Sequence, residues 1–323
     1  MADMSAAGSS PRPAPMADVK GKTAFITGGA NGIGLGIARA LMRAGANVVI
    51  ADIRESSLAE AKASLGADDQ VETVQLDVTD RAGFARAADQ AEARFGKIHM
   101  LIGNAGIGVM GPVLDARYDD WDWGLGVNLG GVINGLVTIL PRIKAHGEGG
   151  QIVTTSSQSA LIPISFSSIY TASKAAILGL SEAIRGELAA ENIGVSAFMP
   201  GPVQSNISQS GELRPDQYKQ DSGYKAREED LQKRPNSPLW MEADEVGERV
   251  LAGIRNNDLY ILTHPEFAQG MRTRFDAILA SMPDEPINQA RAEGIGFLLG
   301  NKVFDEQLER RTAEPVKSPE VVK

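Results

Sequence analysis

The chain contains no cysteine, so disulfide bonds, thiolate nucleophiles and cysteine-ligated metals are all excluded. Histidine is almost as scarce: His99, His146 and His264 lie far apart and lack the spacing of a histidine metal motif. No run approaches the roughly 18 consecutive apolar residues that a membrane-spanning helix needs. We therefore predict neither a metal site nor a membrane segment.

Positive charge is in deficit across the whole chain. Its 323 residues include 32 Lys and Arg against 41 Asp and Glu, a formal net charge of −9. Such an acidic chain argues against nucleic acid or an anionic membrane surface as the main partner, and a small-molecule substrate is expected. Because 43% of the residues are apolar, the chain can bury a sizeable core. A soluble, cytoplasmic protein is predicted.

The two ends of the chain differ in composition from its middle. The first residues are rich in Ala, Ser and Pro and have no apolar centre, which is typical of neither a signal peptide nor an anchor. A polar stretch with three prolines is too long for an ordinary connection. We predict a disordered leader over residues 1–19, a main domain over 20–264 with a loop or lid at 204–240, a helical extension over 265–310 and a disordered tail over 311–323.

Short apolar runs alternate with amphipathic stretches from residue 21 onward, the pattern of β-α units with a parallel sheet. Most runs are rich in Val, Ile and Leu without strict alternation, as strands covered on both faces are. The predicted strands are 23–27, 47–51, 71–76, 100–103, 151–155, 195–199 and 259–262, and the predicted helices are 33–44, 55–65, 80–95, 118–145, 169–190, 266–281 and 286–299. The fold class is therefore α/β, a doubly wound seven-stranded parallel sheet with helices on both faces.

The first predicted strand runs into T-G-G-A-N-G-I-G, residues 27–34, and then directly into a helix. Glycines let the backbone turn tightly and approach a pyrophosphate, which the free N–H groups and dipole of the helix N-terminus stabilise. A glycine-rich turn alone is common, but a strand before it and a helix after it favour dinucleotide binding over a plain turn. The candidate contacts are Gly28, Asn31, Gly32, Ile33 and Gly34.

An acidic residue, Asp52, follows the second predicted strand, 18 residues beyond Gly34. A carboxylate at this place accepts hydrogen bonds from the adenosine ribose and repels a 2′-phosphate. Ile53 comes next, and Arg54 is the one nearby cation, which could soften the preference. We predict NAD rather than NADP. Asp52 could also cap the following helix near Ser56, and the two roles are compatible.

Two further predicted strands end in small or polar residues. Asp77 and Val78 close the third strand, and Asn104, Ala105 and Gly106 close the fourth. Ligands of open parallel sheets bind outside the carboxyl ends of the strands. Each sequence alone is an ordinary strand-end turn, but together they predict a cofactor site along one edge of the sheet.

Tyr170 and Lys174 form Y-x-x-x-K at the start of the predicted helix 169–190. Their i, i+4 spacing places both side chains on one face of the helix. Ser157 lies thirteen residues before Tyr170, at the carboxyl end of a predicted strand. The pair alone is weak evidence, because a chain of this composition is expected to contain it by chance roughly 0.2 times. The serine, tyrosine and lysine are expected at the same edge of the sheet as the glycine-rich turn.

Taken together, the motifs of this chain resemble the short-chain dehydrogenase/reductase family over about residues 20–262. They are the glycine-rich turn, the acid after the second strand, N-A-G, a mid-helix Asn, Ser, Y-x-x-x-K and P-G. The resemblance implies a Rossmann-type fold, hydride transfer between nicotinamide and a secondary alcohol or ketone, and a homodimer or homotetramer that pairs helices 118–145 and 169–190. It also implies the tetrad Asn128, Ser157, Tyr170 and Lys174, and a nicotinamide site at Pro200, Gly201, Val203 and Ser205, the last replacing a common Thr.

Physical chemistry supports the implied roles. A phenol with an unperturbed pKa near 10 is a poor base at neutral pH, and the Lys174 ammonium and the nicotinamide charge should lower the pKa of Tyr170. Tyr170 could then exchange the alcohol proton while Ser157 holds the substrate oxygen. Asn128 lies in a glycine-rich helix segment, so a local distortion that lets it position a relay water is expected. Close helix packing is the alternative reason for those glycines.

A narrower resemblance concerns the substrate. Segments 118–135, 205–215 and 258–266 look like the bacterial Cα-dehydrogenases of lignin β-aryl ether breakdown and related alcohol dehydrogenases for bulky ketones. This subgroup implies oxidation of large aryl secondary alcohols with NAD. Apolar and aromatic residues near the site independently indicate an apolar pocket, or else packing of the lid or a subunit contact. They are Leu161, Ile162, Pro163, Ile164, Phe166, Tyr218, Tyr224 and Trp240.

Several alternatives remain open from the sequence. Steroids, terpenols and other hydrophobic alcohols are possible substrates, and a non-catalytic nucleotide-sensing protein or a dehydratase or epimerase on the same fold are rival functions. Trp121 and Trp123 are expected to be core or interface anchors. Asp119, Asp120 and Asp122 are expected to favour the N-terminus of helix 118–145 rather than to form a catalytic carboxylate pair.

Overall fold

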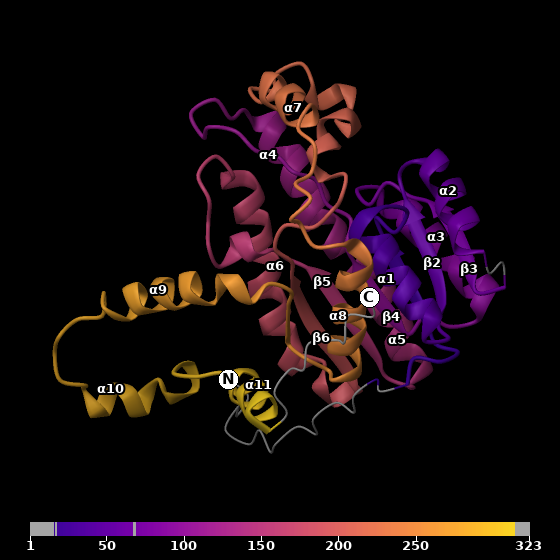
Figure 1. The fold of residues 1–323 in the computed structure, drawn as a ribbon. Coiled ribbons are helices and arrows are strands. Elements are labelled where there is room, and N and C mark those ends of the chain that lie inside the picture. The colour runs from indigo at the N-terminus through magenta and orange to yellow at the C-terminus, as the bar shows by residue number, and fades with distance from the viewer. Residues whose placement is uncertain (1–15, 17, 67–68, 314–323) are drawn as a thin grey trace. The chain divides into compact units, whose positions relative to one another are not determined.

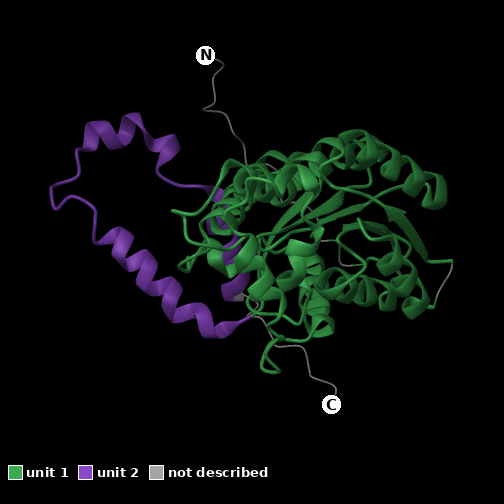
Figure 2. Cartoon of the chain, turned by 90° about the horizontal axis from the view of Figure 1, so that it is seen from above, with its two compact units in different colours: residues 1–263 green, residues 264–323 purple. Residues whose placement is uncertain are grey.

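A computed structural model describes residues 16, 18–66 and 69–313. Most of the expected leader and tail therefore lies outside the described residues. The chain divides into two compact units, Met1–Thr263 and His264–Lys323, which Figure 2 colours separately.

The first unit is built on one seven-stranded parallel sheet in the order β3-β2-β1-β4-β5-β6-β7 (Figure 1). The order reverses direction at β1 and β4, which is the arrangement of a doubly wound sheet. The strands are β1 (Thr23–Thr27), β2 (Asn47–Asp52), β3 (Val71–Gln75), β4 (Met100–Gly103), β5 (Gly150–Thr155), β6 (Ile193–Met199) and β7 (Tyr260–Leu262). All seven predicted strands are present, and the Rossmann-type fold class is confirmed.

Helices cover both faces of this sheet. On one face Ile26 and Ile50 of the strands pack with Ile37 and Val250, and on the other Phe25 stacks on Phe84 with ring centroids 5.8 Å apart. The helices of the first face are α1 (Gly32–Arg43), α2 (Glu55–Leu65) and α8 (Ala243–Arg255), and those of the second are α3 (Arg81–Phe95), α5 (Gly131–His146) and α6 (Ser168–Glu187). Burial on both faces explains why the strands show no polar alternation.

Helix α8 was not predicted, yet it packs closely along α1. Two glycines let the backbones approach: a Cβ on Gly36 would lie 2.0 Å from the Ala243 carbonyl oxygen, and one on Gly247 would lie 2.2 Å from the Gly36 carbonyl oxygen. Glycine is unfavourable inside helices. Its presence at both positions was a signal of close packing that the sequence contained.

The long predicted helix over 118–145 is divided into three parts. The α-helix α4 (Tyr118–Leu125) passes through one π-helical turn, η2 (Gly126–Gly130), into α5. The distortion expected around Asn128 is therefore present. By length and composition alone, Tyr118–His146 could cross a membrane, which differs from our expectation. It packs against β4, α3 and α6, so it is a core helix of this unit.

The second unit consists of short helices. They are α9 (Ala268–Leu279), α10 (Gln289–Gly294) and α11 (Lys302–Ala313). The expected segment 286–299 is only partly helical, and α11 was not predicted. Because α11 continues to Ala313, the first residues of the expected disordered tail are helical. At the other end Val19 is fully buried, so the expected leader ends earlier than residue 19.

Candidate active site

A cavity of about 430 Å³ lies at the carboxyl ends of the strands. Its wall comes from the glycine-rich turn after β1, the ends of β2 to β6, the start of α6 and the segment after Pro200. Lining residues from the predicted cofactor site are Gly28, Asn31, Gly32, Ile33, Asp52, Ile53, Asp77, Val78, Asn104, Ala105, Gly106, Tyr170, Lys174, Pro200 and Ser205. Parallel strands explain this convergence, because all their carboxyl ends meet at one edge.

The glycine-rich turn has the geometry of a close backbone approach. Gly28 and Gly32 adopt φ angles of 61° and 46°, a region that side-chain-bearing residues rarely occupy. The Asn104 amide nitrogen donates to the carbonyl oxygens of Thr27 at 3.1 Å and Gly28 at 3.0 Å, so the end of β4 holds the turn. Gly34 does not line the cavity; a Cβ there would lie 2.2 Å from the Gly28 carbonyl oxygen. Its role is packing within the turn.

The N-terminus of α1 suits an anionic ligand. Its first turn contains no acidic residue, and the N-cap Asn31 makes no side-chain cap. The buried Asn31 amide nitrogen has no hydrogen-bond partner among the described residues. Such a donor is available to an acceptor on a ligand. These features fit the pyrophosphate of a dinucleotide.

Asp52 is hydrogen-bonded to the backbone of two loops, the glycine-rich turn and the loop after β2. Its carboxylate accepts hydrogen bonds from the backbone N–H of Ala30 at 3.3 Å and of Arg54 at 3.2 Å. Arg54, not Asp52, is the N-cap of α2, so the capping alternative is not what the structure shows. Arg54 also lines the cavity, and its buried Nε has no partner in the described part of the chain. This nearby cation therefore lines the same cavity as Asp52.

Tyr170 and Lys174 lie in the first turns of α6 and face the same cavity. The Lys174 ammonium is 5.5 Å from the centre of the Tyr170 ring and donates to the Thr155 carbonyl oxygen at 2.8 Å. Only 3% of Lys174 is exposed, and burial lowers its pKa to about 8. Desolvation disfavours the ammonium because low-dielectric surroundings solvate charge poorly.

The expected lowering of the Tyr170 pKa is not what the protein alone shows. Burial raises the pKa of this phenol, and a hydrogen bond with the Ser157 side chain opposes the rise only in part. The expectation combined the charges of Lys174 and the nicotinamide and omitted the loss of water around the hydroxyl, which dominates in the protein alone. Ser157 is 8% exposed and does not itself line the cavity; its oxygen accepts from the Ser159 N–H at 3.1 Å.

Asn128 is fully buried in the π-helical turn and does not reach the cavity. Its side-chain oxygen accepts from the Ile107 N–H at 2.8 Å, and its nitrogen donates to the Ile107 carbonyl at 3.0 Å and to Ser173 Oγ at 3.2 Å. It therefore ties the loop after β4 to α6. A Cβ on Gly106 would lie 3.2 Å from Asn128 Oδ1 and 3.3 Å from Lys174 Nζ, so glycine leaves room where these two side chains meet.

Two residues of the predicted nicotinamide site lie outside the cavity wall. The Gly201 N–H donates to Thr263 Oγ1 at 3.1 Å, and Val203 is 5% exposed and forms a β-bridge with Met241. Pro200 and Ser205 do line the cavity. Ser205 also lies against the glycine-rich turn, since a Cβ on Gly32 would come within 3.0 Å of its Cβ.

The expected lid is an ordered segment with short helices. They are the 3₁₀ turns η5 (Ile207–Leu213) and η6 (Asp216–Tyr218) and the α-helix α7 (Lys225–Gln232). Gln204 N donates to the Met241 carbonyl at 2.9 Å, which joins the two ends of the segment. Of its three aromatic residues, Tyr218 lines the cavity, Tyr224 is buried elsewhere and Trp240 does not line it.

The apolar run between Ser157 and Tyr170 does not form the cavity wall, which leaves its alternative role in packing or in a subunit contact. Leu161, Ile162, Pro163, Ile164 and Phe166 do not line the cavity, and Ile164 and Phe166 are each 58% exposed. The apolar wall comes instead from residues far apart in sequence. They are Ile107, Trp123, Val127, Ile207, Leu213 and Pro215. From the sequence Trp123 is expected to be a core or interface anchor. Its place in the cavity wall depends on packing between α4 and the lid segment.

Comparison with known proteins gives consistent results. The profile of the short chain dehydrogenase family matches residues 22–215. A C alpha-dehydrogenase from a Sphingobium species is 40% identical over 270 residues, 83% of this chain and 88% of the relative. A putative short-chain dehydrogenase structure from Novosphingobium aromaticivorans is similar, with TM-score 0.74 and 36% identity over 91% of this chain and 99% of that chain. A Burkholderia phymatum short chain dehydrogenase/reductase in complex with NAD has TM-score 0.76 and 32% identity over 84% of this chain and 99% of that chain.

Proposed function

Because this chain belongs to the short-chain dehydrogenase family, we propose that it transfers a hydride between NAD and a bulky, aromatic secondary alcohol or ketone through Tyr170. The family makes it an oxidoreductase of CH–OH groups that uses a nicotinamide cofactor. One observation carries the finer proposal: Tyr170 and Lys174 face the same cavity as the glycine-rich turn and an apolar, aromatic wall.

In this proposal the cofactor and the side chains of the site have separate parts in the reaction. The bound nicotinamide supplies the hydride acceptor in oxidation or the hydride donor in reduction. Tyr170 removes the proton from the alcohol oxygen in oxidation and returns it in reduction. Ser157 hydrogen-bonds Tyr170 in the protein alone. When substrate is bound, we propose that its single hydroxyl proton is donated to the substrate oxygen instead and stabilises the developing charge there. Asn128 bonds to Ile107 and to Ser173 of α6, and so it fixes the helix that carries Tyr170 and Lys174 against the loop after β4.

Lys174 has a particular part in this proposal. Burial already raises the pKa of Tyr170 in the protein alone, so the phenolate needs positive charge nearby. The Lys174 ammonium and the oxidised nicotinamide supply that charge once the cofactor is bound. Because the pKa of Lys174 is about 8, this lysine is mostly protonated at neutral pH and loses its charge in mildly alkaline solution.

NAD is the proposed cofactor because Asp52 lines the cavity where the adenosine ribose would lie. A carboxylate repels a 2′-phosphate and accepts hydrogen bonds from ribose hydroxyls. Arg54 lines the same part of the cavity and works against this preference. We therefore expect NAD to be favoured, with measurable activity remaining with NADP.

The proposal of a bulky substrate rests on the apolar wall of the cavity and on the resemblance of the sequence to the Cα-dehydrogenase subgroup. Trp123, Leu213 and Tyr218 contribute apolar and aromatic side chains to the cavity that Tyr170 also lines. Such walls suit hydrophobic ligands and would leave a small alcohol poorly held. Steroids and aliphatic alcohols belong in the same test, since the wall alone does not distinguish the kinds of hydrophobic substrate.

The test is a spectrophotometric screen of aryl, steroid and aliphatic secondary alcohols with NAD and NADP side by side. NADH formation with aryl alcohols at higher kcat/KM than with small alcohols supports the proposal. Activity on small alcohols only contradicts the bulky-substrate assignment. No NADH formation with any alcohol favours a nucleotide-sensing protein instead.

We also propose that the chain forms a homodimer or homotetramer through α5 and α6. Ile133 and Val137 of α5 are spaced i, i+4 and remain 42% and 70% exposed on a helix whose other face is in the core. Exposed apolar residues on one helix face support a contact with a second copy.

A further inference from the structure

We propose that Arg214 is a positioning residue that holds Trp123 and the 213–218 segment in place as the substrate-facing wall. Arg214 does so through a buried ion-pair cluster with Asp120 and Glu228, which we call the Arg214 cluster. This inference rests on the proposed function, because it assigns the specificity of that same cavity to side chains behind its wall. None of the three charged residues lines the cavity.

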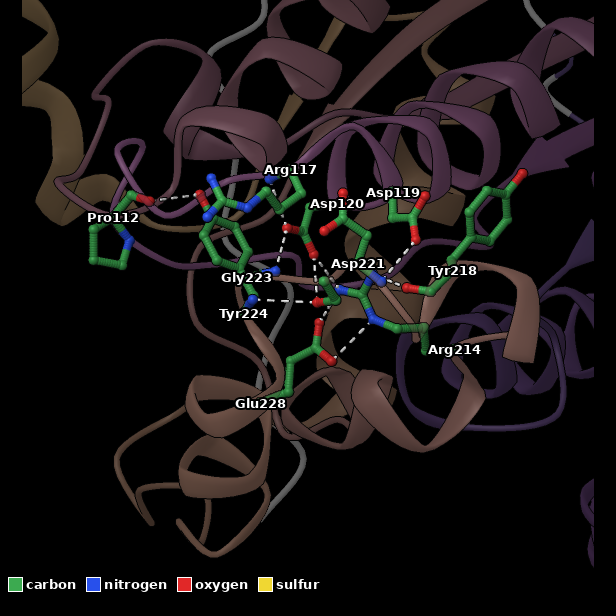
Figure 3. Close-up of polar contacts among 11 residues, drawn as sticks. Pro112, Arg117, Asp119, Asp120, Arg214, Tyr218, Asp221, Gly223, Tyr224 and Glu228 are labelled. Atoms are coloured by element: carbon green, nitrogen blue, oxygen red, sulfur yellow. Dashed lines mark hydrogen bonds and ion pairs between the residues drawn. The ribbon is translucent and has the colours of Figure 1, made fainter.

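The Arg214 cluster joins three separate pieces of chain (Figure 3). Arg214 Nη2 lies 3.0 Å from Asp120 Oδ1 of α4, and it also donates to Glu228 Oε1 of α7. Arg214 Nε donates to Glu228 Oε2 at 3.1 Å, so the arginine binds this carboxylate with two nitrogens. The side chains of Arg214, Asp120 and Glu228 are 2%, 0% and 7% exposed.

Further bonds extend the cluster along the lid segment. Arg214 Nη1 donates to the Tyr218 carbonyl oxygen at 3.2 Å, which fixes the turn that carries Tyr218. The Asp120 carboxylate accepts from Ser222 Oγ at 2.7 Å and from the Gly223 N–H at 3.0 Å. These contacts are visible around Asp120 in Figure 3. Both halves of the lid segment are thus attached to the first turn of α4.

The link from the cluster to the substrate wall is Trp123. The guanidinium carbon of Arg214 lies 4.2 Å from the centre of the Trp123 ring, a cation–π distance. Trp123 is 3% exposed and at the same time lines the cavity. The indole is therefore held between Arg214 and the space for the substrate. Leu213 and Pro215, the neighbours of Arg214 in sequence, line the same cavity.

Burial explains why one arginine can control this wall. Two desolvated carboxylates next to one another repel, and Arg214 is the cation that bonds to both. A lysine cannot reproduce the planar two-nitrogen contact or stack on the indole in the same way. Replacing Arg214 is therefore expected to loosen α7 and η6 and to free the Trp123 ring, while the glycine-rich turn and Tyr170 stay in place.

The test compares Arg214→Lys with Arg234→Lys, a matched control in the same lid segment. Arg234 forms an exposed i, i+4 ion pair with Asp230 and touches none of the cluster. Because Arg214→Lys could fail to fold, an uncharged triple variant, Arg214→Met with Asp120→Asn and Glu228→Gln, is made in parallel. Each protein is measured with NAD, with an aryl secondary alcohol and with a small secondary alcohol such as 2-propanol.

We expect Arg214→Lys to raise KM for the aryl alcohol about 10-fold, with the KM for NAD and kcat/KM for the small alcohol close to wild type. Trp123→Phe should raise the same KM, and the double variant should lose less than the product of the two single effects. Equal losses with both alcohols, or a raised KM for NAD, would overturn the inference. So would a triple variant with unchanged KM for the aryl alcohol.

Hydrogen exchange separates this inference from the proposed function. Backbone amides of residues 213–224 should exchange faster in Arg214→Lys than in wild type or Arg234→Lys, whether or not any alcohol is turned over. Unchanged exchange contradicts the positioning role. Faster exchange in a chain that produces no NADH from any alcohol supports the positioning role and contradicts the proposed function.

Discussion

The Lys174 ammonium lies 5.5 Å from the centre of the Tyr170 ring, and it donates its hydrogen bond to the Thr155 carbonyl rather than to the phenol. The lysine is thus held in place by the end of β5 and not by a hydrogen bond to the tyrosine. Both groups are held in surroundings that disfavour their charged forms. The site therefore carries an electrostatic penalty that a bound cofactor can offset.

Lys174→Met should stabilise the fold while removing activity. A pKa lowered from 10.5 to about 8 corresponds to a penalty of about 3 kcal/mol at pH 7. Losing the hydrogen bond to Thr155 costs about 1 kcal/mol, so a net gain of roughly 2 kcal/mol in the free energy of unfolding is expected. Urea unfolding at pH 7 measures it.

The pH dependence of the stability difference between wild type and Lys174→Met gives the control. Between pH 8 and 10.5 the unfolded wild type binds a proton at Lys174 that the folded protein has released, so wild-type stability rises with pH in this window. The advantage of the variant should shrink over the window. A constant difference from pH 7 to pH 10.5 would show that Lys174 is not destabilised by burial.

Tyr170→Phe should abolish turnover and leave NADH binding nearly intact. The substitution removes the hydroxyl that exchanges the substrate proton but keeps the ring in its place on α6. General acid–base groups typically contribute about 10²–10⁴-fold, so kcat should fall by at least that factor. NADH fluorescence titration measures binding beside the kinetic assay. Wild-type turnover in this variant would contradict the assignment of Tyr170.

Asp52→Ser should shift the cofactor preference toward NADP. Removing the carboxylate ends the repulsion of a 2′-phosphate and leaves Arg54 as the charged side chain at that end of the cavity. The ratio of kcat/KM for NAD to that for NADP should fall by about 10-fold or more. Arg54→Gln is the opposite variant and should raise this ratio. A ratio unchanged in both variants would contradict the placement of the ribose beside Asp52.

Gly36→Ala should destabilise the fold by several kcal/mol, because its Cβ would meet the Ala243 carbonyl oxygen at 2.0 Å and force α8 away from α1. The matched control is Gly179→Ala in the interior of α6, where a Cβ meets nothing within 4 Å. That variant should gain up to about 1 kcal/mol from helix propensity. Thermal unfolding of both variants checks the opposite signs.

Val137→Glu should shift the protein toward the monomer if α5 forms the proposed subunit contact. Val137 is 70% exposed, so the substitution introduces a charge without disturbing the core of the unit. Light scattering coupled to size exclusion measures the mass. The control is Val113→Glu, which adds the same charge at a residue that is 60% exposed outside α5 and α6. An unchanged mass in Val137→Glu would place the contact elsewhere.

Local sequence determined the sheet, most of its helices and the ends of the strands where the cavity lies. Apolar runs and helical periodicity depend on neighbouring residues, so strands β1 and β4 could be predicted to the residue. The glycine-rich turn and the Tyr170–Lys174 spacing are likewise short patterns. Helix α8 was missed, although Gly36 and Gly247 already marked the close approach of two backbones.

Tertiary structure alone decided which side chains form the substrate wall and how their charges are balanced. Leu161 to Ile164 and Phe166 are apolar and close in sequence to Tyr170, yet they lie outside the cavity, while Leu213 and Trp123 come to it from distant segments. The Arg214 cluster joins residues about a hundred positions apart. Burial and desolvation depend on what packs against a group from elsewhere in the chain, and no local pattern contains that information.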